Sequence, residues 1–174
     1  MLLNDIASPA VSMAEAQAYA RVETGEEEAL LAGLVRSATA LCEAFTGQVL
    51  VTRPFEERLE ATGEWRRLAL SPVQVIDSVQ AVTFDGTVTP LASDAYAIDI
   101  DSRGDGWVRS GVSGTLLVSG RAGLAEDSNG IPEPLRQGIL RLVAHLFATR
   151  DGQSGEPPAA VTALWRPYRR MRLA

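Results

Sequence analysis

Two apolar stripes with helical spacing, one on each side of a long β-type stretch, constrain the fold of this chain more than any other feature. The first stripe recurs every three or four residues, as on one face of an α-helix. Gly47 follows where a glycine ends many helices, and Thr24 with Glu27 forms a capping-box pattern. A helix over residues 26–46 is therefore predicted, with the stripe Leu31, Leu34, Val35, Ala38, Leu41, Cys42 and Phe45.

The second stripe predicts a helix over residues 133–149. Pro132 and Pro134 stand at its start, where proline is tolerated because the first amides of a helix have no partner within it. We expect this stripe to pack on the first, through Leu135, Ile139, Leu142, Val143, Leu146 and Phe147. A further capping box, Ser12 with Glu15, predicts a short helix over residues 13–21.

Between these helices, residues 48–120 form short β-rich runs broken by glycine, proline and aspartate. Asp85-Gly86 supplies the positive φ angles of a tight hairpin. We expect a small antiparallel β-sheet inserted into a helical bundle, hence an α+β fold with residues 1–158 as one domain. The expected strands lie at 49–51, 65–70, 73–76, 79–84, 96–100 and 115–119.

The C-terminal end has a different character. Residues 151–158 have the composition of a linker, and residues 159–174 carry four arginines and no acid. Trp165 and Tyr168 lie among these arginines, a combination that favours protein partners or nucleic acid. Because the chain has a net charge of −6, a protein groove is favoured over a phosphate backbone. Two alternatives are a solvated basic end without a partner and a segment that folds back onto the protein's own core.

Catalytic and metal-binding patterns are weak. The single cysteine, Cys42, and the single histidine, His145, argue against a disulfide framework, a zinc site and a histidine metal site. Asp99, Asp101 and Asp105 resemble a calcium loop but lack the EF-hand spacing. We therefore find no catalytic constellation and expect no metal site; a hydrolase with an unrecognised site, which His145→Ala would test, stays as the enzymatic alternative. The chain has no long apolar run, so we expect no membrane span. It also has no basic stretch followed by an apolar one near its start, so we expect no secretory signal.

The order of these segments resembles the phage head-to-tail connector (adaptor) proteins, including the adaptors of phage-like gene transfer agents. The resemblance covers nearly the whole length, with the β region similar in type more than in residues. It depends on residues 11–16, 21–23, 27–31 and 43–47, on Ile131-Pro132-Glu133-Pro134 with the helix after it, and on residues 157–161 with Pro167-Tyr168-Arg169-Arg170.

This resemblance implies a ring, usually of twelve protomers, that sits beneath the portal protein at the head–tail interface of the particle. The helical part would build the ring, the far face would receive the tail-completion (stopper) protein, and DNA would pass through the lumen without specific binding during packaging and ejection. Family members have no enzymatic activity or cofactor. The protein would be made in the bacterial cytoplasm and carried in the phage or gene transfer agent particle.

The resemblance also implies a portal-docking tail at residues 159–174. One departure concerns the β insertion, which is larger than in all-helical members, so its role stays open. The alternative function is a small nucleic-acid-binding packaging-accessory protein that uses the same arginines. The residues expected to contact the portal are Trp165, Arg166, Tyr168, Arg169, Arg170 and Arg172.

Overall fold

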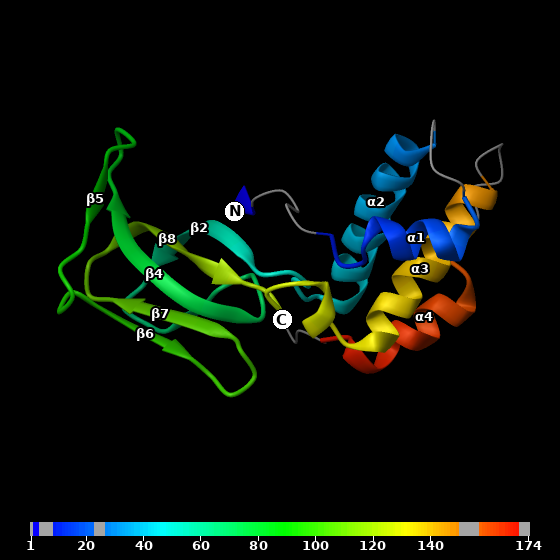
Figure 1. Cartoon of the computed structure of the whole chain (residues 1–174). Coiled ribbons are helices and arrows are strands. Elements are labelled where there is room, and N and C mark those ends of the chain that lie inside the picture. Colours follow the sequence, from blue (N-terminus) through cyan, green and yellow to red (C-terminus); the bar gives the residue numbers. More distant parts are fainter. Residues whose placement is uncertain (1, 4–8, 23–26, 150–156, 171–174) are drawn as a thin grey trace. The chain divides into compact units, whose positions relative to one another are not determined.

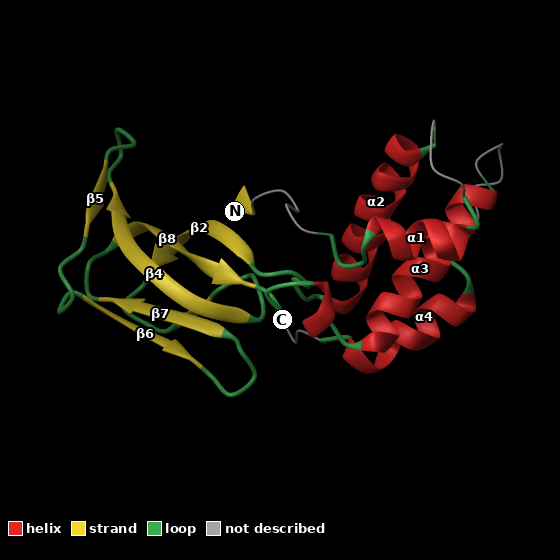
Figure 2. Ribbon diagram, viewed as in Figure 1, coloured by secondary structure: helices red, strands yellow, loops and turns green. Residues whose placement is uncertain are grey.

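The computed structural model describes residues 2–3, 9–22, 27–149 and 157–170, and it confirms the mixed α+β fold (Figures 1 and 2). The chain divides into two compact units. The β unit comprises residues 1–7 and 52–123, and the helical unit comprises residues 8–51 and 124–174. The sequence predicted one domain with a separate tail. The structure differs because the β insertion buries a core of its own and the start of the tail packs into the helical unit.

The helical unit contains the predicted helices within a few residues of the expected ends. They are α1 (Met13–Ala20), α2 (Glu28–Thr46) and α3 (Glu133–Ala148). A further helix, α4 (Ala159–Trp165), begins the segment predicted as the tail, and short 3-10 turns lie at Ser128–Gly130 and Arg166–Tyr168. Ser12 and Glu15 form the capping box predicted for α1. Gly47 ends α2 with a φ of 69°, a left-handed conformation that favours glycine. The N-cap position of α2 is Glu27, three residues after the predicted cap Thr24, which itself lies outside the described residues.

The stripes of α2 and α3 share one core, as expected, and α1 and α4 pack on α3. Leu41 is an exception to the predicted stripe because its side chain is 45% exposed. The fully or nearly fully buried members of this core include Val11, Ala16, Leu31, Val35, Ala38, Cys42, Leu135, Ile139, Leu142, Val143, Val161 and Trp165.

Helix α2 is more apolar than its burial in the helical unit accounts for. The most apolar 18-residue segment of this helix is only one-third buried. By length and composition alone such a helix could cross a membrane, a test that core helices of soluble proteins also pass. The apolar side chains that α2 leaves exposed include Leu30 and Leu41.

The β unit contains two antiparallel sheets (Figure 2). The first has the order β1 (Leu2–Leu3), β2 (Arg53–Ala61), β8 (Gly114–Ala122), β4 (Val73–Val82) and β5 (Val88–Pro90). The second has the order β3 (Arg66–Arg67), β7 (Gly106–Ser110) and β6 (Tyr96–Ile100). Their shared core includes Phe55, Leu68, Val79, Val108, Leu116 and Val118.

The predicted strands were partly right. Strand β6 and the hairpin turn between β4 and β5 lie where expected, while two predicted runs merge into the single strand β4. Residues 49–51 are not a strand; Val51 forms an isolated bridge with Ala125. Strands β2 and β7 had no counterpart in the prediction.

Candidate partner-binding surface

The predicted docking tail begins as a helix that belongs to the core of the helical unit. Pro157 and Pro158 precede α4, and Val161 and Trp165, one turn apart, are both buried. The indole Nε1 of Trp165 donates a hydrogen bond to the backbone oxygen of Leu135, at 3.3 Å. The Trp165 ring also lies 5.9 Å from the ring of Phe45, tilted by 53°. Trp165 thus joins α4 to both α3 and α2.

Gly138 makes this arrangement possible. A Cβ atom at this position of α3 would stand 2.0 Å from Nε1 of Trp165, well inside any real contact distance. The indole therefore occupies the space that a side chain would take on α3. The prediction that Trp165 contacts the portal is corrected by this packing, because the side chain is 1% exposed within its own subunit.

Backbone hydrogen bonds fasten the residues that follow. Nε2 of Gln48 donates to the Tyr168 carbonyl oxygen at 2.6 Å, and the Arg170 amide donates to the Thr46 carbonyl oxygen at 2.8 Å. Tyr168 is half-buried against the helical core. The chain is therefore held against the C-terminal end of α2 as far as Arg170, and most of the predicted linker lies outside the described residues.

The arginines of this segment differ in exposure. Arg166 and Arg169 are exposed, whereas Arg170 is half-buried. The guanidinium of Arg169 lies 5.6 Å from the ring centroid of Phe45, close enough for a cation–π contact. Arg172 lies outside the described residues. Among the predicted contact residues that the structure describes, Arg166 and Arg169 are therefore the arginines whose charge is accessible to a partner.

Cys42 and the acidic loop around Asp101, which the sequence analysis considered as possible chemical sites, lie in environments that explain them structurally. Burial raises the pKa of the Cys42 thiol far above its usual range, with the nearby carboxylate of Glu43 as a lesser cause. Asp101 lies in the acidic loop and accepts the backbone amides of Arg103 and Asp105, which lowers its pKa. Among the described residues, no group of three or more metal-ligating side chains comes together.

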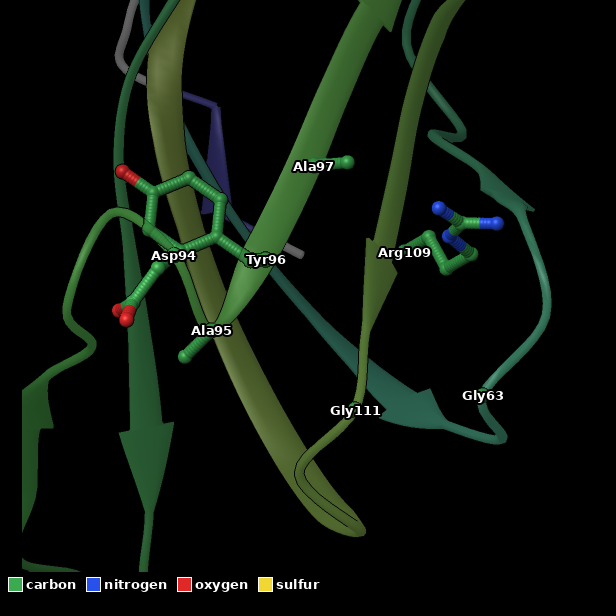
Figure 3. A pocket seen from close by; sticks show the side chains of 7 residues that line it. All are labelled: Gly63, Asp94, Ala95, Tyr96, Ala97, Arg109 and Gly111. Atoms are coloured by element: carbon green, nitrogen blue, oxygen red, sulfur yellow. The ribbon is translucent and has the colours of Figure 1, made fainter.

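An open cavity of about 300 Å³ lies in the β unit between β6, β7 and the loop at Gly63. Figure 3 shows its charged groups on different sides of strand β6: Asp94 and Tyr96 lie on one side, and Arg109 with Ala97 on the other. An acid–base pair that acts on one small molecule needs both groups within hydrogen-bond reach of it. The cavity does not have this geometry.

Comparisons with known proteins place the fold. No protein-family model matches the chain, and no curated protein matches it. Solved structures match it along its whole length. A chain of the "Neck of empty GTA particle computed with C6 symmetry" is 26% identical with a TM-score of 0.79, over 100% of this chain and 98% of that chain.

Two further matches are of the same kind. A chain of the "Virion of native gene transfer agent (GTA) particle" is 25% identical with a TM-score of 0.78, and a chain of the "Neck of native GTA particle computed with C12 symmetry" is 24% identical with a TM-score of 0.73. Both cover 100% of this chain and 98% of the other. These neighbours are structural parts of a gene transfer agent particle, and they support a structural role in the particle neck.

Proposed function

We propose that this protein is a head–tail adaptor: a protomer of a ring beneath the portal that joins the capsid to the tail and lets DNA pass. One observation carries the proposal, namely the full-length likeness, at 25% identity or more, to chains of a gene transfer agent neck and virion. The order of segments noted in the sequence supports the adaptor assignment among neck proteins. The role is structural, with no catalytic step.

A ring of twelve copies is what the resemblance in the sequence implies. The matched neck was computed with C6 symmetry, and twelve is a multiple of six. Helix α2 leaves Leu30 and Leu41 43% and 45% exposed. On a protein of this composition, such a helix face is stabilised when a neighbouring protomer covers it. Leu41→Glu is expected to prevent ring formation while leaving the core, which Leu41 does not enter, folded.

The exposed arginines near the C-terminal end would bind the portal. Arg166 and Arg169 would contact the portal together with Tyr168, Arg170 and Arg172, and Trp165 would fix the position of this segment from inside the core. A single exposed ion pair contributes at most about 1 kcal/mol. Twelve copies that bind at once convert weak single contacts into a lasting attachment.

The net charge of −6 suits a ring through which DNA slides, because like charges do not hold the strand. The opposite side of the ring would receive the stopper protein. The protein would be synthesised in the bacterial cytoplasm and would act in the particle.

The test is capture of the protein by the portal protein of the same particle. Arg166→Glu with Arg169→Glu is expected to lower capture at least tenfold, while the matched control Arg141→Glu, at another exposed arginine of the helical unit, leaves it unchanged. Unchanged capture by the double variant would refute the docking role of these arginines. A gel shift with DNA that weakens steeply with salt would favour the nucleic-acid-binding alternative.

A further inference from the structure

The second sheet carries a solvent-facing surface with the composition of a protein-binding site. Arg109 of β7 pairs with Ala97 of β6, and Trp107 pairs with Arg67 of β3, so these four side chains lie on one face. Val108, which points the other way, is fully buried. The guanidinium of Arg109 lies 5.1 Å from the Trp65 ring centroid. We call Trp65, Arg67, Ala97, Trp107 and Arg109 the tryptophan face.

This face is unusual because tryptophan and arginine are the residues most enriched where proteins bind one another tightly. Trp65 is 40% exposed. The cavity of about 300 Å³ adjoins Arg109 and is lined on that side by the small residues Gly63, Ala97 and Gly111 (Figure 3). Small residues beside an aromatic ring and a guanidinium leave room for one inserted aromatic side chain.

A matching projection lies elsewhere on the same unit. Phe84, at the turn between β4 and β5, has a relative exposure of 109%, so its ring touches no part of its own subunit that would shield it from water. The turn is nevertheless ordered. The Thr83 amide donates to the Thr87 carbonyl oxygen at 2.9 Å, and Gly86 donates to that of Thr83 at 2.9 Å.

The carboxylate of Asp85 completes this turn. It accepts the Thr83 hydroxyl and, at 3.0 Å, the Thr87 amide. The carboxylate is ionised at neutral pH, as an ordinary aspartate is, and these hydrogen bonds lower the pKa of Asp85 further. The turn thus presents an aromatic ring and a negative charge side by side in a fixed conformation. Such preorganisation reduces the ordering cost of binding.

We propose that Phe84 and Asp85 of one protomer dock on the tryptophan face of the neighbouring copy of this chain. The Phe84 ring packs against Trp65 and the Arg109 guanidinium, and the Asp85 carboxylate pairs with Arg109 or Arg67. The proposal rests on the proposed ring. Contact between two different patches generates a closed ring when the rotation from one copy to the next adds up to a full turn. It assigns the β insertion to the joining of adjacent protomers.

A second copy fits this face better than DNA does. Residues 52–123 contain seven arginines and ten acidic residues, so the β unit as a whole repels phosphate. The projection supplies a further aromatic ring, which can pack with those of the face, and an anion that complements Arg109 and Arg67, of which Arg67 also lies 3.7 Å from Asp105 of its own chain. Because Phe84 is fully exposed in its own subunit, the face that receives it belongs to another chain.

The first experiment is site-directed cross-linking in rings assembled on the portal. The buried Cys42 gives little background, so one variant carries Thr87→Cys, on the projecting turn, and a second carries Ala97→Cys, on the tryptophan face. Mixed rings are expected to give disulfide-linked pairs that contain one chain of each type, whereas rings of either variant alone give none. Rings without mixed pairs would overturn the inference but not the ring itself. A wild-type chain that forms no ring would overturn the proposed function and this inference together.

The second experiment separates packing from charge. Phe84→Ala is expected to lower the yield of rings at least tenfold, while the matched control Val112→Ala, at an exposed apolar side chain on another turn, has no effect. Asp85→Arg and Arg109→Asp each weaken assembly, and the two together restore it. Two results would overturn the inference in favour of another partner. One is a Phe84→Ala variant that forms normal rings but fails to recruit the stopper protein. The other is binding of DNA by the protein that Arg109→Asp abolishes.

Discussion

Replacing Trp165 by alanine tests whether this residue serves the core or a partner. An aromatic side chain of this size buries roughly 200 Å², and about 25 cal/mol per Å² gives a transfer contribution of about 5 kcal/mol. Measured tryptophan-to-alanine changes in cores cost about 3–5 kcal/mol. Loss of the Nε1 bond to Leu135 adds about 1 kcal/mol. Trp165→Ala is therefore expected to lower the free energy of unfolding of the helical unit by about 4–6 kcal/mol.

The assay is urea or thermal unfolding followed by the helical circular dichroism signal. At about 2–4 °C per kcal/mol for a chain of this size, the melting temperature should fall by roughly 8–24 °C. Gly138→Ala provides the matched test, because its Cβ would stand 2.0 Å from the indole Nε1. This substitution should destabilise the wild-type protein by about 2 kcal/mol or more and cost far less in the Trp165→Ala background.

Two results would refute this reasoning. The first is a Trp165→Ala variant that keeps its stability within about 1 kcal/mol yet loses capture by the portal, since the indole would then serve the partner. The second is strict additivity of Trp165→Ala and Gly138→Ala, since residues in contact show a coupling energy.

Three further predictions concern groups in the helical unit. Ser12→Ala removes a hydrogen bond to the Glu15 amide, 3.2 Å long, and should cost about 1 kcal/mol in thermal unfolding; an unchanged melting temperature would contradict the role of the cap. Hydrogen bonds from Ser12, and then the charge of Arg136, lower the pKa of Glu15 from 4.5. Its stabilising contribution is therefore complete above pH 4.5 and is lost as the pH falls through the lower, folded value, so the stability gap between wild type and Glu15→Gln should close in acid and stay open at neutral pH. Burial keeps the Cys42 thiol protonated, so a thiol reagent should label it only after unfolding, and rapid labelling of the folded protein would contradict its burial.

The sequence predicted the helices well because each has a local signal. Ser12 with Glu15, Gly47 and Pro132 mark helix ends through hydrogen bonds and φ angles that depend on a few neighbouring residues. The apolar spacing then selects the buried face. Leu41 fails this rule because it lies at the margin of the stripe, where the neighbouring helices no longer cover it.

Strand β2 escaped prediction because charged residues occupy buried positions. Arg53 and Glu57 both lie on the inward face beside Phe55, and the Glu57 carboxylate accepts the Ala69 amide at 2.9 Å. The usual alternation of apolar and polar residues is therefore absent. Ala69, whose amide Glu57 accepts, lies outside the strand, so no local pattern could reveal this contact.

The candidate site was predicted in part. The sequence identified the arginine-rich segment but placed Trp165 on its surface, because arginine and tryptophan together suggest binding. One signal pointed to the core: Val161 and Trp165 are four residues apart and share a helix face. The complementary signal, the missing side chain of Gly138, has meaning only once α3 and α4 are adjacent.

The most direct test of the central claim is electron cryo-microscopy of the portal protein incubated with this chain, and of the intact particle. The account predicts twelve copies in one closed ring, with Arg166 and Arg169 at the portal and Trp165 still inside its own subunit. A portal that carries no such ring, or a particle in which the chain lies away from the neck, would contradict it.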